Sequence, residues 1–131
     1  MTKYLLDTHT AIWALLGNDE KLSAKAKNII ADKTIELAVS IASAWEIAIK
    51  ISKGGKIMDM SGVTVFINKL RENGVEILGI TAEEVKIVES LPFIHNDPFD
   101  RIIIATAKNN GLTIISVDEN VCKYDVACVW K

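Results

Sequence analysis

Hydrophobic residues along this chain form short continuous runs, and longer stretches of mixed polarity separate these runs. A short continuous apolar run is typical of a strand that is buried on both faces. The runs predict strands over residues 3–6, 35–39, 75–80 and 112–116, and a last strand around residues 127–130. The stretches between them predict helices over residues 8–16, 24–32, 40–53, 61–73, 82–90 and 98–110. This alternation favours an α/β fold, with a doubly wound parallel sheet and helices on both faces.

Polar and glycine residues mark the ends of several predicted helices. Thr81 and Glu84 have the spacing of a capping box, in which each side chain bonds the backbone N–H of the other residue. Pro98 follows Asp97 and suits the first turn of a helix, where its missing N–H is not needed. Gly111 follows the helix predicted to end at residue 110, which is typical of a helix end. These signals support the predicted boundaries.

The length and composition of the chain predict one domain over residues 1–131. The chain has 131 residues, half of them hydrophobic, and no internal repeat or linker is visible. A chain of this size buries about two-thirds of the surface that its unfolded form exposes. No apolar run approaches the roughly 20 residues that span a bilayer, and a charge comes too early for a secretory signal. We therefore expect a cytoplasmic protein with no membrane segment, in which Cys122 and Cys128 are reduced thiols.

The net charge gives no support to a nucleic-acid partner but does not exclude one. The chain carries 15 Lys and Arg against 17 Asp and Glu, so its formal net charge is −2. A strongly basic chain would favour nucleic acid. If four of the 17 acids gathered around a metal ion, the other 13 would face 15 cations, and the remaining surface would be weakly positive.

Carboxylates from distant parts of the chain are expected to meet at one edge of the sheet. Ligands of doubly wound sheets bind at the carboxyl ends of the strands, near the point where the strand order reverses. The acids expected at these ends are Asp7, Glu46, Asp97, Asp100 and Asp118. Like charges this close repel one another unless a cation or protons join them. Carboxylate oxygens without a cluster of Cys or His favour Mg²⁺ or Mn²⁺ over zinc.

Most of these acids also have a structural explanation that involves no ligand. Asp7 and Asp97 directly precede predicted helices and suit the N-cap position. Asp100 falls in the first turn of a helix, where the helix dipole favours an anion. Asp118 follows a strand and suits a turn. No single acid decides the question, and the metal interpretation rests on all of them together.

Glu46 has two competing explanations. It is the fourth residue of the sequence Ser43-Ala-Trp-Glu, which matches a capping box. However, Ser40 already offers a cap three residues before Ser43, and both neighbours of Glu46 are apolar. A carboxylate on so apolar a helix needs a partner, which favours a functional role.

Four segments contain the candidate acids in a recurrent pattern. They are residues 5–9 (Leu-Leu-Asp-Thr-His), 43–50 (Ser-Ala-Trp-Glu-Ile-Ala-Ile-Lys), 95–101 (His-Asn-Asp-Pro-Phe-Asp-Arg) and 116–118 (Ser-Val-Asp). With these segments the chain resembles the PIN-domain ribonucleases of the VapC toxin type. The resemblance extends from Tyr4 to Trp130, and residues 95–101 are its most specific part.

The resemblance implies a fold, an activity and a set of partners. The fold is a PIN-like three-layer fold, and the activity is that of a Mg²⁺- or Mn²⁺-dependent endoribonuclease, the toxin of a toxin–antitoxin pair. The implied partners are an RNA substrate, a cognate antitoxin protein and a second copy of the chain in a homodimer. The implied catalytic and metal-binding acids are Asp7, Glu46, Asp100 and Asp118, and Asp97 is auxiliary.

Two more residues of segment 95–101 are auxiliary candidates. His95 could contact the substrate or its phosphate, or it could be a loop histidine bonded to the backbone. Arg101 could bind a phosphate through two parallel hydrogen bonds, or it could pair with a neighbouring acid. The sequence leaves both questions open.

Other functions that use an acid after the first strand fit less well. A phosphatase of the haloacid dehalogenase type needs a second Asp two residues later, where this chain has His9. A receiver domain needs an acid pair after the first strand and a phosphorylatable Asp after a central strand, where this chain has Ser40. A non-enzymatic module that only binds RNA stays open as an alternative.

Overall fold

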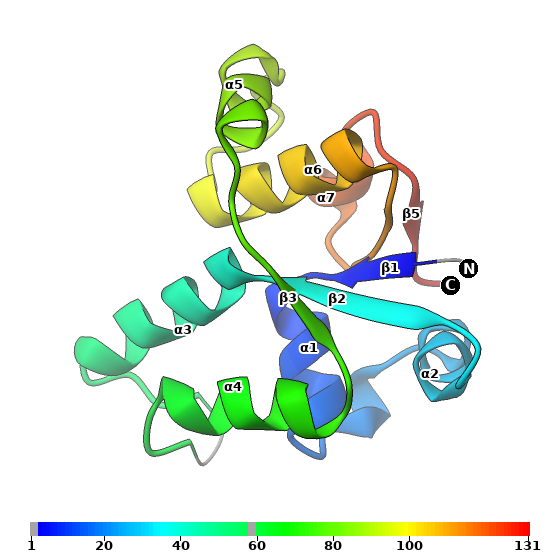
Figure 1. The fold of residues 1–131 in the computed structure, drawn as a ribbon, viewed down its shortest axis with the longest axis vertical. Coiled ribbons are helices and arrows are strands. Elements are labelled where there is room, and N and C mark those ends of the chain that lie inside the picture. Colours follow the sequence, from blue (N-terminus) through cyan, green and yellow to red (C-terminus); the bar gives the residue numbers. More distant parts are fainter. Residues whose placement is uncertain (1–2, 58–59) are drawn as a thin grey trace.

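The protein has a five-stranded parallel sheet within residues 3–57 and 60–131, which are the residues described by this computed structural model. The strand order is β3-β2-β1-β4-β5 (Figure 1). The strands are β1 Lys3–Leu6, β2 Glu36–Ser40, β3 Glu76–Leu78, β4 Thr113–Ile115 and β5 Cys128–Val129. Every neighbouring pair is parallel, so the predicted α/β, doubly wound fold is confirmed.

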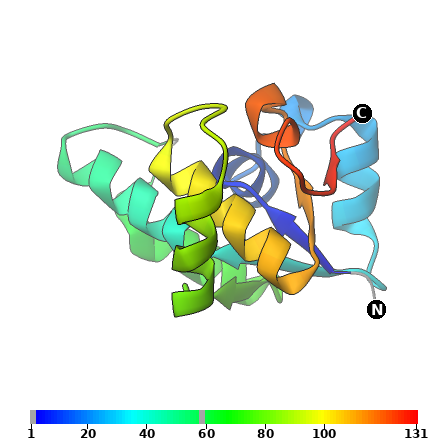
Figure 2. The ribbon, with the colours of Figure 1, turned by 90° about the horizontal axis from the view of Figure 1, so that it is seen from above.

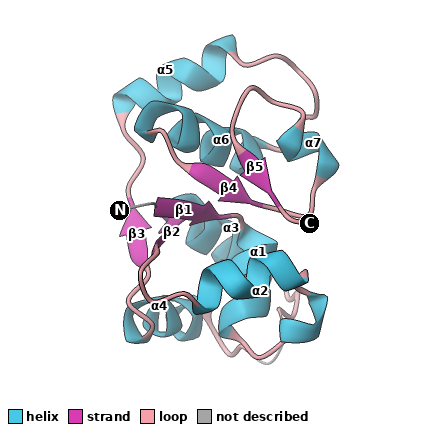
Figure 3. Cartoon of the chain, turned by 90° about the vertical axis from the view of Figure 1, so that its right-hand side faces the viewer, coloured by secondary structure: helices cyan, strands magenta, loops and turns pink. Residues whose placement is uncertain are grey.

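Helices cover both faces of the sheet and give the protein three layers (Figure 3). Helices α5, α6 and α7 lie on one side, α1, α2 and α4 lie on the other, and α3 extends away from the end of β2 (Figure 1). Their bounds are α1 Thr8–Leu15, α2 Ala24–Ala31, α3 Ile41–Ser52, α4 Val63–Glu72, α5 Ala82–Ser90, α6 Pro98–Asn110 and α7 Glu119–Cys122, with a 3₁₀ turn at Asp19–Lys21. Among the helices described, none combines the length and apolar character needed to cross a membrane.

Adjacent residues of the central strand belong to different cores. Leu5 lies in the core that contains Ile104 of α6, whereas its neighbour Leu6 lies in the core that contains Phe66 of α4. All four residues are fully buried. Successive side chains of a strand point to opposite faces, so a strand covered on both faces is apolar at every position. This packing explains the continuous hydrophobic runs of the sequence.

Side-chain caps and a glycine set the helix ends as the sequence predicted. The Ser40 hydroxyl accepts a bond from the Ala42 N–H at 3.0 Å and begins α3. Thr81 and Glu84 form the predicted capping box of α5. Gly111 ends α6 with a φ of +63°, in the left-handed region that glycine adopts without strain. These three predictions are confirmed.

Strand β3 is shorter than the predicted strand over residues 75–80. Its last residue, Leu78, pairs with Ser40, the last residue of β2. The chain enters α3 at Ile41, so β2 offers no partner for a longer β3. The pairing of the neighbouring strand, rather than hydrophobicity, therefore sets the length of β3.

The last part of the chain contains a helix that the sequence did not predict. Beyond Asp118 the sequence indicates a turn, whereas the structure has the four-residue helix α7. The strand expected around residues 127–130 is present as the two-residue strand β5. The short length of α7 leaves no amphipathic pattern from which it could be predicted.

Cys122 and Cys128 form a disulfide, so the expectation of reduced thiols is wrong. Cys122 ends α7 and Cys128 begins β5, and their Cα atoms lie 5.4 Å apart, within the range that a disulfide spans. The turn of the chain after α7 brings the two residues together, and the sequence spacing did not reveal this turn. Disulfides persist mainly in oxidising compartments, so this bond does not support the cytoplasmic location expected from the sequence.

A buried carboxylate joins α5 to α6, which cross each other in Figure 2. Glu84 is only 2% exposed. Its Oε1 accepts a bond from the Thr106 hydroxyl at 2.7 Å, and its Oε2 accepts one from the Asn110 amide at 3.2 Å. Neutral donors therefore satisfy both oxygens, as a buried carboxylate requires. The interaction fixes α5 against the helix that carries Asp100 and is capped by Asp97.

We expect Glu84→Ala to lower the free energy of unfolding by about 2–3 kcal/mol, because the buried donors of Thr106 and Asn110 lose this acceptor. Urea unfolding followed by circular dichroism measures the change. Glu83→Ala is the matched control from the same turn, since the side chain of Glu83 is 67% exposed. Its effect should stay within about 0.5 kcal/mol. Equal losses in the two variants would contradict the role of Glu84.

Candidate metal centre

The strand order brings the ends of β1 and β4 side by side. Strands β2 and β3 lie on one side of β1, and β4 and β5 lie on the other, so the strand order reverses between β1 and β4. Asp7 follows β1 directly, and its backbone N–H donates to the Ile115 carbonyl at the end of β4 at 3.3 Å. Asp118 follows the same end of β4. These two acids therefore flank the point at which doubly wound sheets bind ligands.

Asp7 is a buried acid whose carboxylate is stabilised by Thr10 and Ser116. It is 5% exposed, and its Oδ1 accepts a bond from the Thr10 N–H at 2.9 Å, which makes Asp7 the N-cap of α1. Ser116 also bonds to this carboxylate. Burial raises the pKa of Asp7, and the bonds from Ser116 and Thr10 offset part of the rise. A nearby cation would favour the ionised form of such a group.

Glu46 is held against the start of α1 rather than used as a helix cap. It is 8% exposed, and its Oε1 accepts a bond from the Thr8 hydroxyl at 2.9 Å. Its Oε2 lies 3.4 Å from Nζ of Lys50, whose side chain is half-exposed. Because Ser40 begins α3, the capping box of Ser43 and Glu46 is not formed. Glu46 instead faces the segment that follows β1.

Asp97 and Asp100 lie at the start of α6. Oδ1 of Asp97 accepts bonds from two backbone N–H groups of the first turn, at 2.9 and 3.0 Å, and caps the helix. Burial raises the pKa of Asp100 to about 6, and the charges of Asp97, Asp7 and Glu46 add to the rise, while a bond from His95 opposes it. The acids of three separate elements are therefore close enough for their charges to act on one another.

Asp118 and His95 complete the cluster. Within the residues described, carboxylate oxygens of Asp100 and Asp118 and a ring nitrogen of His95 lie within 4.8 Å of one another. Nε2 of His95 lies 3.2 Å from Oδ2 of Asp100. Asp118 also caps α7, because its Oδ1 accepts a bond from the Asn120 N–H at 2.8 Å.

The N-cap explanation of Asp7 and Asp97 is correct, Asp118 caps α7 where the sequence suggested only a turn, and none of these caps excludes metal binding. Asp7, Asp97 and Asp118 each accept backbone bonds through Oδ1. An ionised carboxylate offers about four acceptor positions on two oxygens, so the cap leaves acceptor capacity free. The cap also fixes the orientation of each carboxylate. One side chain can therefore begin a helix and present an oxygen to an ion.

The donor set fits a hard divalent cation. Asp100 and Asp118 supply carboxylate oxygens beside a ring nitrogen of His95, and carboxylate oxygens are the ligands that Mg²⁺ and Mn²⁺ prefer. Burial is the largest cause of the raised pKa values of Asp7 and Asp100, and the charges of Asp97, Asp7 and Glu46 add to the rise at Asp100. A divalent ion would favour the ionised form of these acids. The structure thus contains a carboxylate cluster suited to such an ion.

Arg101 is buried and does not pair with an acid among the residues that the structure describes. It is 5% exposed. Its terminal nitrogens donate to the carbonyls of Pro92, Val88 and Leu91 at 2.8, 3.3 and 3.3 Å, and to the Tyr124 hydroxyl at 3.1 Å. The guanidinium thus bonds the end of α5, the loop before α6 and Tyr124 instead of pairing with an acid, and its burial leaves little of it exposed to solvent.

Three residues around the cluster were missed in the sequence. Thr8 and Ser116 bond to the carboxylates of Glu46 and Asp7, and each lies within two positions of a candidate acid, which could have marked them. Tyr124 bonds to His95 and Arg101, but it is distant from both in the sequence. No spacing could have indicated it.

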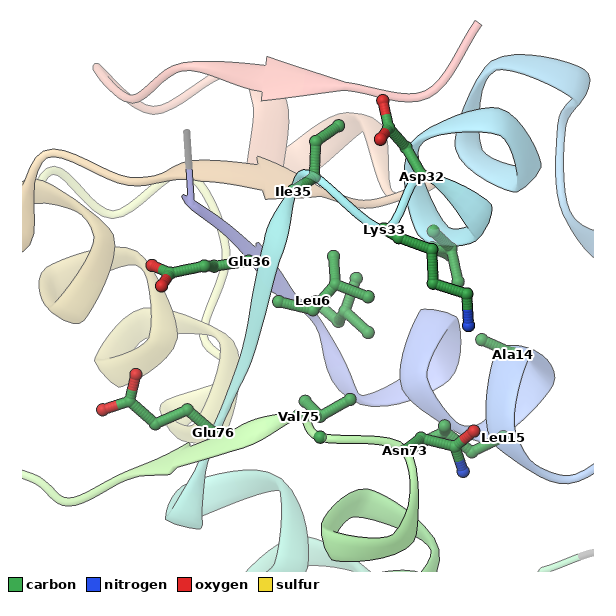
Figure 4. A pocket seen from close by; sticks show the side chains of 13 residues that line it. Leu6, Ala14, Leu15, Asp32, Lys33, Ile35, Glu36, Asn73, Val75 and Glu76 are labelled. Atoms are coloured by element: carbon green, nitrogen blue, oxygen red, sulfur yellow. The ribbon is translucent and has the colours of Figure 1, made fainter. Parts of the chain in front are cut away.

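A hollow at the opposite edge of the sheet lacks the candidate acids (Figure 4). It lies at the amino ends of β2 and β3 and is lined by residues that include Lys33, Glu36 and Glu76. The side chains of Glu36 and Glu76 point away from Lys33 in Figure 4 rather than toward one centre. The carboxylates of this hollow therefore do not form a site like the one at the carboxyl edge.

The sequence model of the PIN domain family matches residues 4–127. The chain belongs to this family. This PIN domain is similar to Ribonuclease VapC22 of Mycobacterium tuberculosis (strain ATCC 25618 / H37Rv). The two are 32% identical over 122 residues, which cover 92% of this chain and 91% of that protein. Membership of the PIN family argues against the haloacid dehalogenase and receiver-domain alternatives.

Solved structures share the fold of this PIN domain. VapBC2 from Rickettsia felis, bound to a DNA fragment from its promoter, matches with a TM-score of 0.71 and 15% identity over 99% of this chain and 100% of that chain. VapC20 from Mycobacterium tuberculosis, a toxin that cleaves the sarcin-ricin loop, matches with a TM-score of 0.65 and 17% identity over 98% of this chain and 99% of that chain. The resemblance to PIN domains stated from the motifs is confirmed.

In the metal-free protein, the wild type should lose stability as the pH rises, and Asp100→Asn should not show this loss. The pKa of Asp100 rises from 3.8 to about 6 on folding, so the folded state binds a proton that the unfolded state lacks between these values. Stability from this group is thus present at low pH and falls as pH rises toward 6. At pH 7 we expect Asp100→Asn to raise the melting temperature by about 3 °C or more.

Thermal melts in EDTA from pH 4 to pH 7 measure the difference between the wild type and the variant. Asp125→Asn is the matched control, because the side chain of Asp125 is fully exposed. It should follow the wild type at every pH. A constant difference between wild type and Asp100→Asn across this range would show that Asp100 carries no raised pKa.

Proposed function

We propose that this PIN-domain chain is a Mg²⁺-dependent endoribonuclease and the toxin of a toxin–antitoxin pair. The observation that carries the proposal is the cluster of Asp100, Asp118 and His95, with Asp7 and Glu46 close enough for their charges to raise the pKa of Asp100. The similarity to a relative named as a ribonuclease supports the reaction class. The similarity in fold to VapBC proteins agrees with the toxin role.

In this proposal the four acids hold Mg²⁺, with Mn²⁺ as a substitute. When bound, the ion supplies an acidified water and stabilises negative charge on the scissile phosphate. The chain holds the acids in position before the ion arrives. Thr8 orients Glu46, and the helix caps orient Asp7 and Asp118. The amino ends of α1 and α6 add a positive field that favours an anionic substrate.

We also propose a cognate antitoxin as partner. An antitoxin that covers the acid cluster must bring a cation, because buried carboxylates without a partner are costly. The solved relatives include a toxin–antitoxin complex from Klebsiella pneumoniae with a TM-score of 0.64. We therefore expect an Arg or Lys of the antitoxin to lie against the acids in the complex.

An exposed apolar face supports the proposal of a homodimer. Trp45 of α3 is 58% exposed and packs edge-on against Phe99 of α6, with ring centroids 5.1 Å apart. Val85 of α5 is 57% exposed, and Ile80 is 37% exposed beside it. An apolar face of this kind is typical of an interaction surface. We assign it to a second copy of the chain.

Removal of metal is expected to abolish RNA cleavage. The purified protein should be inactive in EDTA and should recover with Mg²⁺ or Mn²⁺. Asp7→Asn and Asp100→Asn should each reduce the rate about 100-fold or more, since both remove a ligand charge. Asp97→Asn should reduce it less than about 10-fold, because Asn caps a helix as well as Asp does.

Asp125→Asn serves as the exposed control for these variants and should retain the full rate. Gel-resolved cleavage of RNA by equal amounts of folded protein measures each rate. Full activity after exhaustive chelation would reject the metal-dependent mechanism. RNA binding without cleavage, under every metal condition, would favour the non-enzymatic binding module instead.

The dimer should dissociate when charge enters the apolar face. A twofold interface contains each residue twice, once from each subunit. Trp45→Glu therefore places two negative charges in the interface, and they repel each other. Light scattering should give about twice the 14.4 kDa chain mass for the wild type and the monomer mass for Trp45→Glu at the same concentration. Thr64→Glu is the control: it adds the same charge at an exposed position of α4 and should leave the dimer intact. A wild-type monomer at all concentrations would exclude the dimer.

A further inference from the structure

A buried tyrosine connects the two auxiliary residues of segment 95–101. Tyr124 follows α7 and is 3% exposed, with its side chain in the core that also contains Leu5 and Ile103. Its hydroxyl lies 2.9 Å from Nδ1 of His95 and 3.1 Å from a terminal nitrogen of Arg101. The hydroxyl thus lies between the loop before α6 and the helix itself.

The hydrogen bonds around this hydroxyl determine where its single proton points. Arg101 can only donate, and the backbone N–H of His95 also donates to the hydroxyl, at 3.3 Å. These two donors occupy the two lone pairs of the oxygen. The hydroxyl proton is then left for an acceptor, and Nδ1 of His95 at 2.9 Å is closer than the His95 carbonyl at 3.4 Å.

This arrangement fixes the tautomer of His95. If Nδ1 accepts the tyrosine proton, the neutral imidazole carries its own proton on Nε2. Nε2 lies 3.2 Å from Oδ2 of Asp100, so it donates to that carboxylate. The distances within the cluster alone would also allow Nε2 to be a metal ligand. The bond from Tyr124 makes Nε2 a donor instead.

We propose that Tyr124 is a positioning residue, which locks His95 in the Nε2–H tautomer so that His95 holds one oxygen of Asp100 and leaves the other for the ion. The inference rests on the proposed metal site. It gives His95 a role through Asp100 rather than as a ligand. It also gives Arg101 a role, since its bond to the Tyr124 oxygen helps to direct the tyrosine proton toward His95. Bonds of this kind to metal ligands typically change metal affinity by about 10–100-fold.

Tyr124→Phe tests the inference, because it keeps the ring in the core and removes only the hydroxyl. In metal-free wild type, ¹⁵N NMR of the imidazole rings should show His95 with its proton on Nε2. The chain has two histidines, so His9→Gln assigns the signals. In Tyr124→Phe we expect a mixture of tautomers and a loss of about 10-fold in Mn²⁺ affinity by calorimetry. Tyr4→Phe, at the other tyrosine of the chain, should change neither quantity.

A double-mutant cycle separates this role from a loss of folding. The amide of His95→Gln can donate to Asp100 without help from Tyr124. Tyr124→Phe should therefore cost little Mn²⁺ affinity in the His95→Gln background. An equal loss in both backgrounds would overturn the inference, as would a wild-type His95 with its proton on Nδ1. These readouts require no RNA cleavage, so a failure of the proposed ribonuclease activity would be seen separately.

Discussion

Burial of carboxylates is the constraint on which the architecture of this site depends. A doubly wound parallel sheet gathers its strand ends at one edge, and here Asp7 and Asp118 follow β1 and β4 at that edge. Burial disfavours the ionised form and is the largest cause of the raised pKa values of Asp7 and Asp100, and the charges of Asp97, Asp7 and Glu46 add to the rise at Asp100. Backbone N–H groups and hydroxyls stabilise the acids without neutralising them. The negative charge therefore stays available for a divalent ion.

Three acids of the site are also helix caps, so the same side chains begin helices and line the site. Asp7, Asp97 and Asp118 cap α1, α6 and α7, and Thr8, the first residue of α1, bonds to Glu46 of α3. The amino ends of these helices consequently face the strand edge where the acids lie. Removal of a whole side chain would disturb both functions. An Asp to Asn change preserves the cap and removes the charge, and so separates the two.

Local sequence patterns predicted the parts of the site that lie at element ends. Asp7 follows an apolar run, Asp97 precedes a proline in a helix start, and each lies where its pattern indicated. Glu46 shows the limit of this reasoning: the sequence predicted that Ser40 caps the helix, but only the structure shows that Glu46 bonds to Thr8 of α1. The partners of Arg101 and the Cys122–Cys128 disulfide could not be predicted. The disulfide and the bond from Arg101 to Tyr124 depend on how the chain returns after β4, and the bonds from Arg101 to Val88, Leu91 and Pro92 depend on how α6 packs against α5; no local period encodes either.

The short segment that follows β4 contributes two residues to the site and its surroundings. Asp118 lies at the start of α7, and Tyr124 lies in the short loop between Cys122 and Cys128. A loop closed by a covalent bond has few alternative conformations, so the tyrosine hydroxyl has little freedom to leave His95 and Arg101. The same turn thus supplies an acid directly and orients a second one, Asp100, through His95. The segment after β4 thereby affects the cluster in two ways: directly through Asp118, and through the bond from Tyr124 to His95.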